Sequence, residues 1–219
     1  MLKDKKVLIL APHMDDAEIG CGGLIAHFAH FAHVREFIFS SAAQSTIEAG
    51  HTVEQLENEH ITAYQVLVQE ENKENIVFYK GSKDIPVRHF PSHRQEILDE
   101  MVSLIGFFDP DIVLLPGTGD VHQDHQVIHD EGIRAFRGCS ILGYEISHNY
   151  VNGSFRNDMY IPLSDDEMGR KIAAVECFET QRHRADRSGP DVIKALAMTR
   201  GAQIGVRYAE AYEVIRWVL

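Results

Sequence analysis

Cysteine and basic residues are scarce in this chain of 219 residues. The three cysteines, Cys21, Cys139 and Cys177, are odd in number and form no Cys-x-x-Cys pair, which argues against a disulfide framework and a thiolate zinc site. Few, unpaired cysteines are typical of proteins in a reducing compartment. Lysine and arginine total 21 against 33 acidic residues, so the net charge is -12. The negative electrostatic potential of such a protein does not attract the phosphate backbone of a nucleic acid. We therefore expect no nucleic-acid partner.

Long apolar runs are also absent from the sequence. No stretch approaches the about 18 apolar residues that span a bilayer, and Val7 to Leu10 is too short for the core of a signal peptide. We expect no membrane span and a cytoplasmic protein. Internal repeats, low-complexity tracts and Pro/Ser-rich linkers are missing too. The sequence therefore predicts a single domain over residues 1–219.

Alternating strand and helix patterns indicate the fold class. Short apolar, β-branched runs predict strands over 6–10, 36–40, 75–79 and 111–115, the first stopped by Pro12, and later over 141–146, 157–161 and 212–218. Apolar residues at helical spacing predict helices from Asp15 or Asp16 to about His33, and over 53–68, 93–107, 124–136, 165–180 and 190–200. Such alternation is typical of an α/β fold with a Rossmann-like, mostly parallel sheet and helices on both faces.

Histidine is the abundant residue, with 13 copies, and several of these gather in two segments. The first, Ala-Pro-His-Met-Asp-Asp-Ala-Glu-Ile-Gly over 11–20, leaves the first predicted strand. The second, Gly-Asp-Val-His-Gln-Asp-His over 119–125, leaves the strand predicted to end at Leu115. Ligands of parallel α/β sheets bind at the carboxyl ends of strands, and imidazoles with carboxylates are zinc ligands.

The spacing within these segments predicts a catalytic zinc site. His13 and Asp16, three apart at a helix start, can converge on one ion, and a catalytic zinc needs one further protein ligand. His125, on the first turn of the following helix, is the third predicted ligand, while His122 stays in the loop. Asp15 is then free to act as the general base toward water. Iron(II) is the alternative ion, because two histidines and one carboxylate suit both metals.

Together the two motifs, Pro-His-x-Asp-Asp-x-Glu-Ile-Gly and His-x-Asp-His, resemble the PIG-L/LmbE family of zinc-dependent N-acetylglucosamine deacetylases. Glu59, Ala63 and Leu67 are similar to the family's Glu-x-x-x-Ala-x-x-x-Leu helix, and the segment from Gly201 to Ala211 is similar to its closing Gly...Tyr-Ala-Glu-Ala-Phe. The resemblance implies an LmbE-like fold and removal of an N-acetyl group from an amino sugar or its conjugate. It also implies a homo-oligomer, a trimer or hexamer.

By position, the resemblance assigns His13, Asp16 and His125 to zinc and Asp15 to the base. It makes His122 the second catalytic histidine, which stabilises the oxyanion or passes a proton to the departing amine, with Asp124 orienting it. Three positions depart from the family: Met14 replaces a proline, Glu57 an arginine, and Thr180-Gln181 a Ser-Gln. The lost arginine concerns substrate contacts, not the metal site.

Other residues have competing interpretations. One alternative for the first motif is purely structural, with Asp16 capping the helix N-terminus. That alternative leaves the second histidine-rich segment unexplained. Glu18 is either a partner of a metal ligand or a first-turn carboxylate that favours the helix dipole. His129 is more readily a polar helix-face or supporting residue than a fourth ligand. His148 is a weak candidate in a loop near the site, and His183, beside three arginines, either contacts an anionic part of the substrate or belongs to a basic loop.

Two other functions compete with deacetylation. One is a non-catalytic sugar-binding module on the same fold, and the other is an amidohydrolase acting on a non-sugar amide. A dinucleotide cofactor is disfavoured, because Gly20-Cys21-Gly22-Gly23 lies beyond a turn whose two carboxylates would repel a pyrophosphate.

Overall fold

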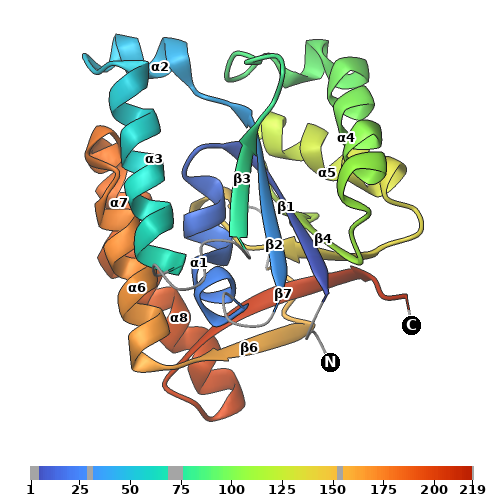
Figure 1. Cartoon of the computed structure of the whole chain (residues 1–219). Helices are drawn as coiled ribbons and strands as arrows, with labels where there is room; N and C mark the ends of the chain where they lie inside the picture. Colours follow the sequence, from blue (N-terminus) through green and yellow to red (C-terminus); the bar gives the residue numbers. More distant parts are fainter. Residues whose placement is uncertain (1–4, 29–31, 69–75, 152–154, 219) are drawn as a thin grey trace.

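A seven-stranded sheet forms the centre of the computed structural model, which describes residues 5–28, 32–68, 76–151 and 155–218 (Figure 1). Its strands are β1 (Lys6–His13), β2 (His33–Ser40), β3 (Ile76–Lys80), β4 (Ile112–Pro116), β5 (Ser140–Tyr144), β6 (Met159–Leu163) and β7 (Tyr208–Arg216), in the order β3-β2-β1-β4-β5-β7-β6. Strands β1 to β5 pair in parallel, whereas β7 runs antiparallel to β5 and β6. The predicted mostly parallel α/β sheet is confirmed.

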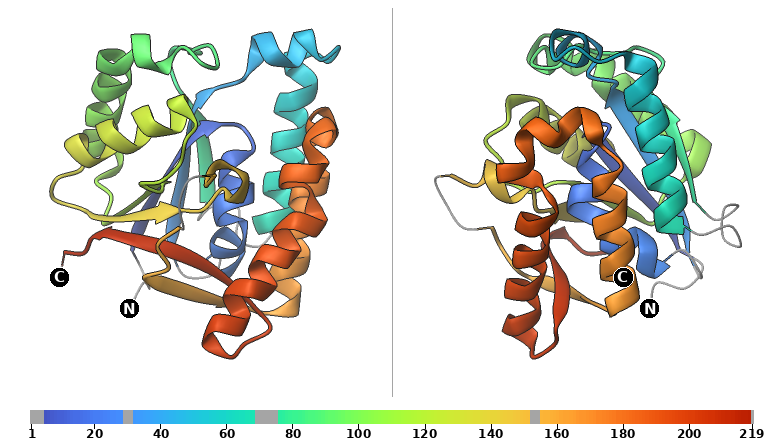
Figure 2. Two further views of the ribbon diagram at one scale, coloured as in Figure 1. Left: turned by 180° about the vertical axis from the view of Figure 1, so that it is seen from behind. Right: turned by 90° about the vertical axis from the view of Figure 1, so that its left-hand side faces the viewer.

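Helices cover both faces of this sheet (Figures 1 and 2). One face carries α1 (Asp16–Phe28), α3 (Val53–Val68), α6 (Asp165–Glu176) and α8 (Pro190–Ile204), and the other carries α4 (Arg94–Phe108) and α5 (Gln123–Ala135). Strand β1 divides its side chains between the two cores, with Val7 and Ile9 in one and Leu8 and Leu10 in the other. Successive residues of a strand point to opposite faces, so an unbroken apolar run is what a doubly covered strand requires.

Several predicted boundaries were wrong. The helix predicted to reach His33 ends at Phe28, and His33 instead begins β2. The helix predicted to Thr180 ends at Glu176, and the last strand begins at Tyr208. Two short helices, α2 (Ala43–Glu48) and α7 (Ala185–Ser188), were not predicted. Asn75, the predicted first residue of the third strand, lies outside the described residues.

Pro12 does not stop the first strand, contrary to the prediction. The ladder to β2 pairs Ala11 with Ile38 and His13 with Ser40, so it skips Pro12. The register with β4 covers only Val7 to Ile9. The missing N–H of Pro12 therefore interrupts neither ladder, and the strand carries His13 to the sheet edge.

The glycines of α1 allow this helix to approach the strands closely. A Cβ atom on Gly20 would lie 2.5 Å from Cδ2 of Tyr144, and one on Gly23 would lie 2.5 Å from Cδ1 of Leu163. The backbone N–H groups of Gly23 and Leu24 each donate to the Glu210 carboxylate at 2.7 Å. The glycine run thus serves helix packing, consistent with the absence of a dinucleotide fingerprint.

Lys171 and Glu210 form a buried ion pair at 2.5 Å, with side chains only 5% exposed. Glu210→Gln should destabilise the protein by about 3–5 kcal/mol, because it leaves the Lys171 ammonium buried without a counter-charge. Urea unfolding measures this loss. Asp165→Asn is the matched control, since it breaks an exposed pair with Arg207 and should change the midpoint little. Equal effects of both substitutions would contradict the assignment.

Within the described ranges, no helix is long and apolar enough to cross a membrane. Cys21, Cys139 and Cys177 are all free thiols, as their number and spacing predicted. The predicted single domain stays a prediction.

Candidate metal centre and active site

The two predicted segments meet at one edge of the sheet. His13 is the last residue of β1, and His125 lies on the first turn of α5, which follows β4. Strands β1 and β4 are neighbours, and the strand order reverses between them. In doubly wound sheets this switch point is where ligands bind.

His13, Asp16 and His125 converge, as the spacing predicted. Oδ2 of Asp16 lies 3.1 Å from His13 Nδ1 and 3.2 Å from His125 Nε2. The three residues offer ligand atoms within 4.8 Å of one another. Ligands bound to one tetrahedral zinc at about 2.0–2.1 Å are separated by about 3.4 Å. The geometry therefore fits a shared ion.

Carboxylates hold the far nitrogens of both imidazoles. Oδ2 of Asp120 lies 2.7 Å from His125 Nδ1, and Oδ2 of Asp124 lies 3.2 Å from His13 Nε2. Asp124 also accepts hydrogen bonds from the backbone N–H groups of Arg88 and Phe90. Carboxylate–histidine pairs of this kind fix ligand orientation in zinc sites.

The predicted role of Asp124 in orienting His122 stays a prediction. Its carboxylate lies 3.2 Å from His13 Nε2, and its backbone N–H donates to His122 Nδ1 at 3.2 Å. A carboxylate oxygen of Asp124 also lies within 4.8 Å of a His122 ring nitrogen. Because His122 is the N-cap of α5, its side chain serves the first turn of the helix.

Asp120 was not identified from the sequence, although it lies in the second motif. Its Oδ1 accepts from the backbone N–H of His122 at 2.8 Å, and its Oδ2 accepts from Asn149 Nδ2 at 3.0 Å. A carboxylate five residues before a histidine ligand was the available signal, but only the loop conformation turns it onto the ring.

Asp120→Asn should weaken zinc binding by about 10–100-fold, because His125 loses its anionic partner. Competition with a chromogenic chelator measures the affinity. Asp130→Asn, at an exposed position of α5, the helix that carries His125, is the control and should bind zinc as the parent does. Unchanged affinity in Asp120→Asn would show that Asp120 does not support the ligand.

The His122 ring presents a donor to the site. Because Nδ1 accepts from Asp124 N–H, the proton of the neutral imidazole is on Nε2. Burial, with the nearby His125 and His13, lowers the pKa of His122 to about 4. The ring is therefore a neutral N–H donor that borders the cavity.

Asp15 differs from its neighbour Asp16. Asp16 accepts from His13 N–H at 2.9 Å as well as contacting both imidazoles. Within the part of the chain that the structure describes, no other residue forms a hydrogen bond with the Asp15 side chain, and Asp15 borders the same cavity. Burial and the Asp16 charge raise its pKa. Asp15 is thus available for proton transfer.

The charges at this site favour a cation. Although burial opposes it, Asp16 and Asp120 raise the pKa of His125 to about 10. Burial likewise opposes ionisation of Asp16, yet His125 and His13 hold its pKa well below the usual range. Buried carboxylates that draw protons onto the facing imidazoles indicate a position where positive charge is stabilised.

A cavity of about 480 Å³ opens over these residues. Three arginines line it: Arg88, Arg184 and Arg187. Among the described residues no carboxylate pairs with Arg88 or Arg184, whereas Arg187 lies 3.8 Å from Asp186. His148 and His183, whose roles the sequence left open, also line the cavity. The rim is therefore cationic in an otherwise acidic protein.

The remaining candidates lie elsewhere. Nδ1 of His129 lies 2.7 Å from the Pro116 carbonyl oxygen inside the core, so this nitrogen is engaged by the backbone. Glu18 is fully buried and faces His60. Glu57 pairs with Lys80 at 2.8 Å and does not line the cavity.

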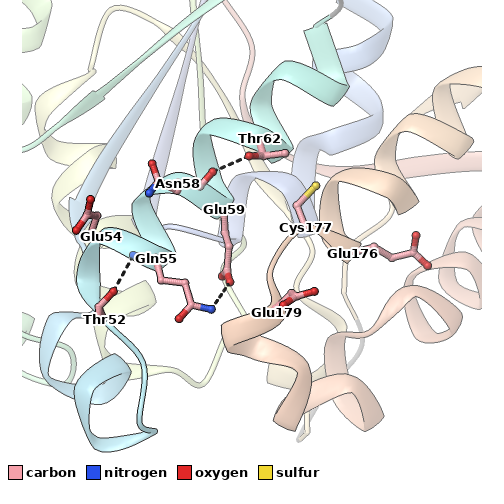
Figure 3. Close-up of a pocket in the computed structure, with 9 residues that line it drawn as sticks. All are labelled: Thr52, Glu54, Gln55, Asn58, Glu59, Thr62, Glu176, Cys177 and Glu179. Carbon is pink, nitrogen blue, oxygen red and sulfur yellow. Dashed lines mark hydrogen bonds between the residues drawn. The ribbon is translucent and has the colours of Figure 1, made fainter.

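Glu59 anchors the start of the segment over residues 180–188, which carries Arg184 and Arg187 of the cationic rim. Its carboxylate accepts from Thr180 N–H and from Thr180 Oγ1, the latter at 2.7 Å. Figure 3 shows Glu59 pointing from α3 toward this segment, with Gln55 donating to it. The groove drawn there contains four glutamates and no histidine, so it lacks the ligand set found at the sheet edge.

Comparison with known families places these residues in context. The sequence model described as PIG-L: GlcNAc-PI de-N-acetylase matches residues 8–136, a range that contains both histidine segments. Residues 137–219, which include the segment with Arg184 and Arg187, lie beyond that match.

Solved structures share the fold over nearly the whole chain. The zinc-inhibited form of teicoplanin deacetylase Orf2 has a TM-score of 0.77 at 18% identity and covers 94% of this chain and 96% of its own. N,N'-diacetylchitobiose deacetylase from Pyrococcus horikoshii has a TM-score of 0.72 at 20% identity, covering 96% and 84%. GalB, a 4-carboxy-2-hydroxymuconate hydratase from Pseudomonas putida KT2440, has a TM-score of 0.73 at 16% identity, covering 98% of both. Deacetylases and a hydratase therefore use this fold.

Proposed function

Since the chain belongs to the PIG-L family of GlcNAc-PI de-N-acetylases, we propose that it is a metal-dependent hydrolase that removes the N-acetyl group from an amino sugar or its conjugate. One observation carries the proposal: at the switch point of the sheet, Asp16 joins His13 and His125 while Asp15 stays free beside them. A ligand set with an uncommitted carboxylate next to it is what metal-assisted amide hydrolysis requires.

His13, Asp16 and His125 would hold the ion. Their donor atoms and the local demand for positive charge fit zinc, with iron(II) as the alternative. A bound zinc supplies Lewis-acid polarisation and acidifies water. Asp120 and Asp124 orient the two imidazoles from behind.

The chain's own groups supply the proton transfers. Asp15 accepts a proton from the attacking water as the new C–O bond forms at the amide carbon. His122 Nε2–H donates to the carbonyl oxygen as negative charge develops there, a contribution of roughly 3 kcal/mol. The proton held on Asp15 then passes to the amide nitrogen, so that C–N cleavage yields acetic acid and an amine, which ionise to acetate and an ammonium group.

The rim favours an amino-sugar conjugate with a negatively charged group. Arg88 and Arg184 line the cavity without an ion pair in the described residues, and the charge of Arg184 opposes the rise in the pKa of Asp15. Both charges therefore act on the space that a ligand would fill. An adjoining hollow of about 600 Å³ shares Asp15 and Gln181 with the cavity and is bordered by Phe178 and Pro190. The two together offer room for more than one sugar ring.

Arg184→Ala should raise KM for N-acetylglucosamine 1-phosphate by about 10–100-fold, because a charge-assisted hydrogen bond of about 1.5–3 kcal/mol is lost. Its KM for uncharged N-acetylglucosamine should change little. Arg207→Ala, which removes an arginine that pairs with Asp165 outside the cavity, is the control. Equal changes for both substrates would argue against an anionic subsite.

Amine release tests the activity itself. The zinc-loaded protein is incubated with N-acetylglucosamine, its 1-phosphate and N,N'-diacetylchitobiose, and free amine is quantified. We expect release from at least one compound, and release at least about 100-fold slower with Asp15→Asn. Binding without release would favour a sugar-binding module, and release only from non-sugar amides would favour the broader amidohydrolase. The predicted cytoplasmic location and homo-oligomer stay predictions.

A further inference from the structure

A second cluster of metal-ligating side chains lies inside the core. Glu18 comes from α1, Glu36 from β2 and His60 from α3, and none is more than 1% exposed. Nε2 of His60 lies 3.4 Å from Glu36 Oε1 and 3.7 Å from Glu18 Oε1. The three residues offer ligand atoms within 4.8 Å of one another.

Hydrogen bonding accounts for only one contact in this cluster. His60 Nε2 and Glu36 Oε1 form a hydrogen bond that is long at 3.4 Å, beyond the usual 2.7–3.2 Å, and the 3.7 Å separation from Glu18 Oε1 is too large for a hydrogen bond. Among the described residues, both oxygens of Glu18 and Oε2 of Glu36 are buried and have no hydrogen-bond partner. A fully buried carboxylate with no partner is rare, because it loses its hydration without compensation.

The surroundings make an uncompensated charge expensive. The His60 ring lies 4.6 Å from the Phe78 ring and 6.4 Å from the Phe178 ring, measured between centroids. No lysine or arginine among the described residues forms an ion pair with Glu18 or Glu36.

We propose that Glu18, Glu36 and His60 form a second, buried site for a divalent transition-metal cation such as zinc. Ligands of one tetrahedral ion at about 2.0–2.1 Å lie about 3.4 Å apart, close to both observed separations. The two carboxylates carry a total charge of −2 and the imidazole is neutral, so a divalent cation makes the cluster neutral. The bound cation therefore offsets the free-energy cost of burying two ionised carboxylates. The free second oxygens allow bidentate coordination.

An ion at this position joins three elements. It ties α1, which begins with the candidate ligand Asp16, to β2 and α3. Its role is structural, because the residues are sealed from solvent and do not line the cavity. The site is separate from the proposed catalytic ion and does not depend on the proposed function.

Metal content tests the proposal. The protein is purified from zinc-supplemented cells, passed over a chelating resin and analysed by inductively coupled plasma mass spectrometry. We expect about two zinc equivalents in the parent and one in Glu36→Gln. Glu131→Gln is the matched control, because Glu131 is equally buried but pairs with Arg94 and Arg134, and it should keep two. Equal zinc content in the parent and Glu36→Gln would overturn the proposal.

The melting temperature of Glu36→Gln in the presence of zinc gives a second test, because a bound ion and protonated acids predict shifts in opposite directions. With an ion bound, Glu36→Gln lowers the melting temperature, because a ligand is lost. If the acids are merely protonated, the substitution leaves the melting temperature unchanged or raises it, and the proposal fails. His125→Ala distinguishes the two sites, since it should lose the catalytic ion and retain one equivalent. Should the catalytic site bind nothing, the parent would hold one equivalent and Glu36→Gln none.

Discussion

Asp15→Asn should lower turnover by about 10²–10⁴-fold while leaving zinc content at the parental level. The carboxylate borders the cavity beside the ligand set, and no side-chain hydrogen bond to it is found in the described part of the chain. Asparagine keeps the shape of the side chain but cannot accept the proton of the attacking water. The loss should therefore appear in kcat, with little change in KM.

The neighbouring carboxylate provides the control. Asp16 bridges His13 and His125, so Asp16→Asn should lose zinc together with activity. Zinc content and turnover measured on both variants separate a base from a ligand. Parental turnover in Asp15→Asn would exclude Asp15 as the base, and loss of its zinc would place Asp15 in the ligand set.

Much of the fold could be predicted because its elements follow local patterns. The helix over Val53–Val68 was predicted at both ends, since its apolar residues recur at helical spacing. Strand β7 was predicted four residues late, because Glu210 interrupts its apolar character. That carboxylate forms a buried ion pair with Lys171, which is distant in the sequence. The ion pair allows a charged residue to occupy a buried strand position that local sequence patterns disfavour.

The convergence of His13, Asp16 and His125 could be predicted from motif spacing and strand ends, but the groups that contact the two imidazoles from behind could not. Asp120 was missed because its role depends on the loop that turns it onto His125. Arg88 reaches the site from a separate connection after β3, and its backbone N–H donates to Asp124 at 2.6 Å. Contacts across 36 residues of chain have no local signature.

His125→Ala should abolish zinc binding at the sheet edge and reduce turnover by more than Asp15→Asn does. Only two of the three ligands remain, and Asp120 is left buried with its imidazole partner removed. The variant loses both the Lewis acid and the activated water, whereas Asp15→Asn loses only the base. Steady-state amine release and metal analysis measure the two effects, with circular dichroism to confirm folding.

His122→Ala is the matched control for the metal, because His122 lines the same cavity but belongs to the N-cap and not to the proposed ligand set. It should retain zinc and lose about 10²–10³-fold in kcat, as expected for removal of an oxyanion donor. The buried Glu18, Glu36 and His60 cluster keeps its own ion in both variants. His125→Ala should therefore fall from two equivalents to one and lose all activity, because only the ion at the sheet edge borders the cavity. Parental zinc content in His125→Ala would remove His125 from the ligand set.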